Sequence, residues 1–200
     1  MFTSFSIQQQ LAQQFPFDQL PEAALAQLLQ GAQPWRYRIG QPILRRETLS
    51  QQVMVILEGH ARLLGQDPRT QQPTTLQRLG PGELLGIISL IRGVPCETVI
   101  ASTELIALPL PAYTILQFLE QYPAFGQAIC DRIYFIETFD LIAQQVQSRA
   151  QDPGDLKRQA QQVCETARVH PLSQGPASLQ HLDPTLTWWG SGAPCSTILS

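Results

Sequence analysis

The chain has 200 residues, of which 44% are hydrophobic and only 14% are charged, and its formal net charge at pH 7 is −3. This length allows one domain with a full core, since a domain of about 150 residues buries roughly 70% of its unfolded surface. A slight excess of acidic residues gives no overall basic field for nucleic acid or for an acidic membrane surface. The sequence has 28 glutamines and a single lysine, Lys157, so its solubility depends on amides rather than on charge.

The cysteines and the N-terminus bear on the compartment. Cys96, Cys130, Cys164 and Cys195 are widely spaced without a Cys-x-x-Cys pair, which favours free thiols in a reducing compartment over disulfides or a zinc site. Residues 1–12 contain no Lys or Arg and no apolar run typical of a secretory signal. The longest apolar run, 105–119, is interrupted by prolines and is too short to cross a bilayer as a helix. We expect a cytoplasmic protein that does not insert into a membrane.

Short helices and then short strands are predicted from the N-terminus. Residues 1–14 are rich in glutamine and weakly amphipathic, and Pro21, leucines at helical spacing and Gly31 predict a helix over 21–30. From Trp35 apolar and polar residues alternate, which predicts strands over 35–39, 43–46, 53–57, 61–64, 74–79, 97–103 and 105–110. Strands at this spacing predict a mainly β fold with flanking helices, a jelly roll or β-roll, and not a βαβ unit.

Glycine and proline mark further boundaries. Gly59 lies between two apolar runs and predicts a hairpin of 53–57 with 61–64, because glycine supplies the positive φ of a tight turn. After Pro111 the apolar residues recur every three or four positions, and past Pro123 they predict a long amphipathic helix from Phe125 to Ile142 that closes the domain. Asp155 is expected to cap one more helix over 155–168.

The last thirty residues differ in composition from the rest. Residues 171–200 are rich in Pro, Ser, Gly and Thr, so we expect a linker or a disordered tail. The pair Trp188 and Trp189 has two interpretations, a contact with another domain or protein and a sticky disordered end. We therefore divide the chain into an N-terminal Gln-rich helix or tail (1–14), a β-roll with flanking helices (15–150), and a short helix with a tail (151–200).

Three phrases in sequence order resemble one family. Residues 17–25 look like the first helix, 39–44 like the first roll strand, and 55–63 like the glycine-turned strand pair of the cyclic-nucleotide-binding domain of catabolite-activator-type regulators, kinase regulatory subunits and gated channels. The resemblance covers about residues 15 to 142. It implies a β-roll with a regulatory role, and such a role depends on the residues of the site rather than on the fold.

The stretch from Gly80 to Ala101 resembles the phosphate-binding cassette of that family. By this resemblance, backbone amides of a turn-helix and an arginine hold the cyclic phosphate, while a glutamate accepts the ribose hydroxyl. Gly86 keeps the family's glycine, but Ile87 stands where the glutamate would be and Cys96 where the arginine would be. Losing a charged partner of a desolvated phosphate costs about 2–5 kcal/mol, and an inward Glu97 would repel a phosphate.

The cassette is therefore interpreted as degenerate. Binding of cyclic AMP or cyclic GMP is not expected, although the turn amides could still hold an anion. The candidate ligand-binding residues of this degenerate cassette are Gly86, Ile87, Ile88, Ser89, Leu90, Arg92, Cys96, Glu97 and Thr98. No catalytic residue, metal ligand or bound cofactor is predicted.

Two side chains of the cassette have competing interpretations. Arg92 could replace the missing arginine, with Arg78 a weaker candidate, but an exposed turn charge is the favoured interpretation. Cys96 is expected to be a small buried hydrophobe rather than a reactive thiol. A ligand sensor predicts an open pocket with Arg92 turned inward, whereas an interaction module predicts that Ile87 fills it. The residues that would line this pocket are Val55, Leu64, Ile87, Ile88 and Ser89.

Other functional classes find little support. Cys164 and His170 lack the flanking motif of a peptidase, and His60, His170 and His181 are too scattered for a metal-binding cupin. The residues after 150 contain one credible helix and few basic residues, so no DNA-reading module is expected.

We therefore expect a non-enzymatic regulatory or sensory domain that acts through a protein partner or a missing downstream domain. A homodimer through the C-terminal helix stays open. The Gln-rich, Lys-poor texture and the sequence around Pro95 also look similar to the N-terminal regulatory segment of bacterial protein-secreting ABC transporters, in which case this chain is a piece that works next to a membrane.

Overall fold

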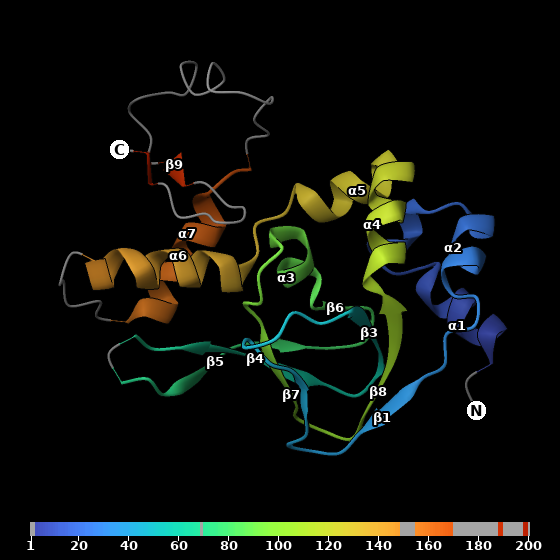
Figure 1. The fold of residues 1–200 in the computed structure, drawn as a ribbon, viewed down its shortest axis with the longest axis horizontal. Helices are drawn as coiled ribbons and strands as arrows, with labels where there is room; N and C mark the ends of the chain where they lie inside the picture. Colours follow the sequence, from blue (N-terminus) through green and yellow to red (C-terminus); the bar gives the residue numbers. More distant parts are fainter. Residues whose placement is uncertain (1–2, 69, 149–154, 170–187, 190–197, 200) are drawn as a thin grey trace.

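Two antiparallel sheets form the centre of the molecule (Figure 1). The computed structural model describes residues 3–68, 70–148, 155–169, 188–189 and 198–199. One sheet has the order β1 (Trp35–Tyr37), β8 (Leu105–Pro111), β3 (Gln52–Glu58), β6 (Leu84–Leu85). The other has the order β2 (Pro42–Leu44), β7 (Thr98–Ala101), β4 (Ala61–Gln66), β5 (Pro73–Leu79). The predicted mainly β roll with flanking helices is thus confirmed.

The predicted hairpin of β3 with β4 is wrong. These strands belong to different sheets, since β3 pairs with β6 and β8, whereas β4 pairs with β5 and β7. Gly59 does turn the chain, with a φ of 84°. The turn is bound to the loop before β8 instead, because the His60 backbone N–H donates to Thr103 Oγ1 at 2.9 Å. The chain therefore crosses from one layer to the other at Gly59.

The N-terminal helices pack into the same core as the roll. They are α1 (Ser4–Leu11), the 3-10 turn η1 (Phe17–Gln19) and α2 (Glu22–Leu28), and the last agrees with the predicted helix over 21–30. Thr3 caps α1 by accepting from the backbone N–H of Ser6. Ile7 and Leu11 of α1 are buried, and Gln10 Nε2 donates to the Leu57 carbonyl of β3 at 2.9 Å. These contacts explain why β3 is buried on both faces.

The C-terminal helical region is divided where one long helix was predicted. After α4 (Ala112–Gln121) come α5 (Pro123–Cys130) and α6 (Phe135–Ser148). The apolar spacing runs across the break, which is why the sequence did not reveal it. Tyr134 stabilises the break, since its hydroxyl donates to the free carbonyl of Ile129 at the end of α5 at 2.9 Å. The long amphipathic helix is thus α6 alone, with 14 residues.

The segment after α6 contains a docked helix and a small strand pair. Asp155 caps α7 (Leu156–Thr166), as predicted, by accepting from the backbone N–H of Arg158 at 3.1 Å. Leu156 and Ala160 are buried, and Lys157 Nζ donates to the Thr75 carbonyl of β5 at 2.6 Å.

The predicted tail over 171–200 is described at four residues only. β9 (Trp188–Trp189) pairs antiparallel with β10 (Ile198–Leu199), so these residues form a strand pair instead of an unstructured tail. The rest of that prediction, including His170, His181 and Cys195, lies outside the described residues. No helix in the described ranges combines the length and the apolar character that a bilayer crossing requires.

Candidate functional site

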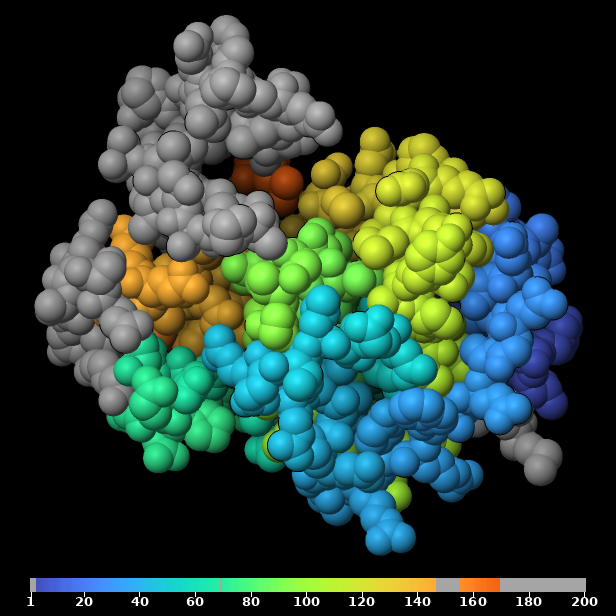
Figure 2. Space-filling model, in the orientation of Figure 1, coloured from blue at the N-terminus to red at the C-terminus, as the bar shows by residue number. Residues whose placement is uncertain are grey.

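Two glycines define a short helix, α3 (Ile87–Arg92), between β6 and β7. Gly86 precedes it with a φ of 87° and Gly93 ends it with a φ of 67°, backbone conformations that favour glycine. In Figure 1, α3 lies between the roll and the C-terminal helices, and in Figure 2 the green segment that contains α3 reaches the surface between α4 and α6. The predicted turn-helix of the cassette is therefore present.

The carboxylate of Glu97 binds the start of α3. Oε1 accepts from the Gly86 backbone N–H at 3.0 Å. Oε2 accepts from the Ser89 backbone N–H and from the Ser89 hydroxyl, both at 2.9 Å. Glu97 is buried, with 5% of its surface exposed. The amides that would face a cyclic phosphate, by the family resemblance, thus hold the carboxyl group of the chain's own Glu97.

Burial and hydrogen bonding act on Glu97 in opposite directions. Burial raises the pKa of its carboxyl above the ordinary range, and the bonds from Ser89 and Gly86 lower it, because they favour the charged form. Burial is the larger influence, so the group takes up a proton more readily than an exposed glutamate does. The hydrogen bonds from Gly86 and Ser89 are the influence that favours its ionised form.

Cys96 contributes to this cluster without being reactive. Its backbone N–H donates to the Ser89 hydroxyl at 3.2 Å, and its Sγ lies 3.5 Å from the same oxygen. Burial raises the pKa of the thiol to about 11. A buried, protonated thiol is a poor nucleophile, which agrees with the interpretation of Cys96 as a small buried hydrophobe.

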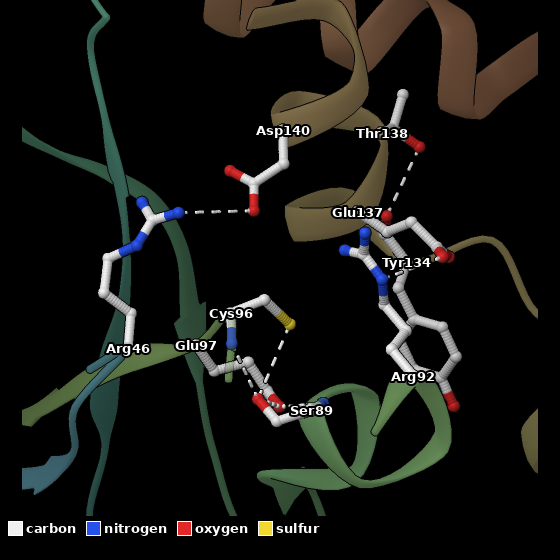
Figure 3. Close-up of polar contacts among 9 residues, drawn as sticks. All are labelled: Arg46, Ser89, Arg92, Cys96, Glu97, Tyr134, Glu137, Thr138 and Asp140. Carbon is white, nitrogen blue, oxygen red and sulfur yellow. Dashed lines mark hydrogen bonds and ion pairs between the residues drawn. The ribbon is translucent and has the colours of Figure 1, made fainter. Parts of the chain in front are cut away.

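Arg92 is buried, and the prediction of an exposed turn charge is wrong. Only 8% of the residue is exposed, and its Nε lies 3.9 Å from Oε1 of Glu137 on α6. Figure 3 shows the guanidinium beside Glu137 and apart from Glu97. Arg92 therefore joins α3 to α6 rather than replacing the arginine missing at Cys96.

Three charged residues beside the cassette were not predicted from the sequence. Glu137 and Asp140 lie on α6, and Arg46, just after β2, places its Nη2 3.8 Å from Oδ2 of Asp140 (Figure 3). Burial raises the pKa of Asp140 to about 6, and Arg46 and Arg92 oppose this shift. The available signal was the spacing of two carboxylates three residues apart on an otherwise apolar helix face.

The remaining predicted site residues belong mainly to the core. Val55, Ile87 and Ile88 are buried, and Leu90 and Leu64 are half-buried. Thr98 begins β7 opposite Leu64 of β4. The structure thus brings Gly86, Ser89, Cys96 and Glu97 together as one hydrogen-bonded cluster and directs Arg92 elsewhere. Within the ranges that the structure describes, His, Cys, Asp and Glu side chains form no group of three suited to a metal ion.

Solved structures share this fold at low sequence identity. The sensor domain of the transcriptional regulator DNR from Pseudomonas aeruginosa has 14% identity and a TM-score of 0.56, over 74% of this chain and 93% of that chain. The regulatory subunit of a cAMP-independent protein kinase A from Trypanosoma cruzi, bound to guanosine, has 19% identity and a TM-score of 0.55, over 82% and 50%. The regulatory domain of Toxoplasma gondii PKA with cAMP has 16% identity and a TM-score of 0.54, over 72% of this chain and 50% of that chain. The chain spans about half the length of these kinase proteins.

The family comparison is consistent with the structural one. No curated protein matches the chain. The family model described as cyclic nucleotide-binding domain matches residues 34–122, which extend from β1 through α3 and the cassette to the end of α4. Residues 34–122 of this chain therefore match the cyclic nucleotide-binding domain family, and the fold of the chain is similar to that of solved proteins of this kind.

Proposed function

We propose that this chain is a non-catalytic regulatory domain whose cassette is occupied by its own Glu97, and that it acts through a partner protein or a further domain. The observation that carries the proposal is the set of three hydrogen bonds from Gly86 and Ser89 to the Glu97 carboxylate. Because Glu97 already binds these donors, we do not expect a cyclic phosphate to regulate the domain. The domain then exerts its regulatory effect through contacts between its surface and the partner protein or further domain.

Electrostatics supports this exclusion of cyclic nucleotides. A cyclic phosphate on the α3 amides would have to displace Glu97 and would then lie next to its charge. Cys96, in the arginine's place, is neutral because of its raised pKa and offers no compensation. Ile87, in the glutamate's place, is buried and has no acceptor for a ribose hydroxyl. The missing arginine alone costs about 2–5 kcal/mol of binding free energy, and the missing glutamate costs about a further 1.5–3 kcal/mol as a charged acceptor of the ribose hydroxyl.

Isothermal titration with cyclic AMP and cyclic GMP tests the proposal. The unmodified chain should bind neither, and the Ile87→Glu, Cys96→Arg variant should also fail, because Glu97 still occupies the amides. Adding Glu97→Ala to that pair should produce binding, whereas adding Glu104→Ala, at an exposed glutamate just before β8, should not. Micromolar binding by the unmodified chain would refute the proposal, and so would binding by the double variant without loss of Glu97.

A neutral nucleoside is the second candidate ligand. The Trypanosoma cruzi regulatory subunit of the same fold was solved with guanosine, which carries no phosphate to compete with Glu97. The carboxylate of Glu97 already satisfies the α3 donors, so a nucleoside would not leave them unpaired. Titration of the unmodified chain with guanosine and with adenosine separates a nucleoside sensor from a domain that acts through protein contacts only.

A further inference from the structure

α6 fits closely on the roll. Ile136, Phe139 and Ile142 are buried, and Phe139 lies over Gly65 of β4, where an added Cβ would come within 2.7 Å of the ring. In packed surfaces of this kind a gap of about 0.5–1 Å already loses a quarter to a half of the contact energy. Lifting α6 from the roll would therefore expose these apolar side chains.

The same contact buries charge. Glu137 faces Arg92 of α3, and Asp140 faces Arg46, which follows β2 (Figure 3). The nearest nitrogen–oxygen distances are 3.9 Å and 3.8 Å, longer than a hydrogen bond. Among the residues that the structure describes, the buried Nε of Arg92 finds no hydrogen-bond partner. Docking thus removes most of the Asp140 and Glu137 side chains from water, and within the described ranges their arginine partners lie beyond the hydrogen-bond distance that would offset the desolvation.

We propose that α6 is a proton-coupled latch, in which protonation of Asp140 strengthens the docking of α6 on the roll and ionisation of Asp140 weakens it. A neutral carboxylic acid is much less costly to bury than a carboxylate, and Asp140 is 8% exposed. The latch concerns the C-terminal helix and does not depend on whether the cassette holds a nucleotide.

Charged groups face Asp140 from several elements. Arg46 follows β2 and Arg92 ends α3, and both favour the ionised form, whereas Glu137 on α6 itself opposes it. The thiol of Cys96, just before β7, is within the electrostatic influence of Asp140 but stays neutral, because its pKa is about 11. Burial outweighs the two arginines and raises the pKa of Asp140 from 3.8 to about 6.

The sign of the effect follows from this shift. When α6 lifts, Asp140 returns to water and its pKa falls toward 3.8, so the docked state binds the proton more tightly. Docking is then strongest at low pH and weakens as the pH rises through about 6. Between pH 5 and pH 7.5 the docking equilibrium should change about tenfold.

Hydrogen–deuterium exchange of the full chain, read by mass spectrometry, tests the latch. The protection of α6 peptides against exchange should be about tenfold greater at pH 5 than at pH 7.5, after correction for the pH dependence of intrinsic exchange. Peptides of β3 serve as the internal reference, since β3 is central to its sheet and buried. The Asp140→Asn variant should be protected at both pH values, because its side chain is always neutral.

The exposed Asp18 provides the matched control. Asp18→Asn makes the same chemical change and should leave the pH dependence of α6 intact. Equal protection of α6 at both pH values in the unmodified chain would overturn the latch. A pH dependence that persists in Asp140→Asn would assign the proton to another group, such as Glu97, and would overturn it as well.

Discussion

Ser89 binds Oε2 of Glu97 twice, through its backbone N–H and through its hydroxyl, both at 2.9 Å. Replacing Ser89 by Ala removes the hydroxyl's bond to a buried acceptor and also the bond that the hydroxyl accepts from the Cys96 backbone N–H, so it should lower the free energy of unfolding by at least about 1.5–3 kcal/mol. Urea denaturation measures this loss. Ser102→Ala removes a bond to a neutral carbonyl, that of His60 at 3.1 Å, and should cost only about 0.5–1.5 kcal/mol. Equal losses would contradict the charged role assigned to Glu97.

Gly65 should not tolerate a side chain. A Cβ at this position would lie 2.7 Å from the Phe139 ring and 2.8 Å from Leu76. We expect Gly65→Ala to destabilise the protein by about 1–3 kcal/mol, because the ring must move off its packing position. Thermal unfolding checks this value. In a Gly65→Ala, Phe139→Leu double variant the two losses should be less than additive, and strict additivity would show that the residues do not meet.

Arg46 should matter only where Asp140 is ionised. Burial raises the pKa of Asp140 to about 6, and Arg46 opposes that shift. Arg46→Gln should therefore lower the free energy of unfolding by about 0.2–1 kcal/mol at pH 7.5, a modest loss because Arg46 is one-third exposed. At pH 4.5, where Asp140 is largely protonated, the loss should vanish.

Urea denaturation at the two pH values gives both numbers. The neighbouring, exposed Arg45→Gln is the control for a general change in charge. The same loss from Arg46→Gln at both pH values would separate Arg46 from the titration of Asp140.

The thiols should differ in reactivity. Burial raises the pKa of Cys96 to about 11 and blocks access to it, while Cys130 is exposed. Burial also raises the pKa of Cys130, but its exposure leaves it accessible, so iodoacetamide at mildly alkaline pH should modify Cys130 before Cys96, which should react only after unfolding. Peptide mapping with and without guanidinium chloride measures the order. Rapid modification of Cys96 in the native protein would show that the cassette opens.

Local pattern predicted the elements better than their partners. The strands followed from alternation and α7 from its cap at Asp155, because both signals lie within a few residues. The pairing of β3 with β8 instead of β4 could not be read locally, because Gly59 serves equally well in a hairpin and in a crossing between sheets. The break before Phe135 was hidden by continuous apolar spacing.

The site was predictable only in part. The residue types at Gly86, Ile87 and Cys96 indicated a cassette without its charged ligands, and Glu97 was expected to repel a phosphate if it pointed inward. The bonds of Glu97 to the α3 donors depend on the three-dimensional position of its side chain, which the sequence does not specify. The burial of Arg92 was unpredictable for a related reason, because its partner Glu137 lies far along the chain on a helix whose position the sequence does not specify.

The contact between Lys157 and Thr75 has a practical consequence. Lys157 is the only lysine of the sequence, and its ammonium group holds α7 to the edge strand β5. Amine-directed chemistry, whether a crosslinker, a dye or an acetyl group, therefore has a single side-chain target in this protein. A label placed there replaces the charged donor of that bond, so it reports on α7 while loosening its attachment.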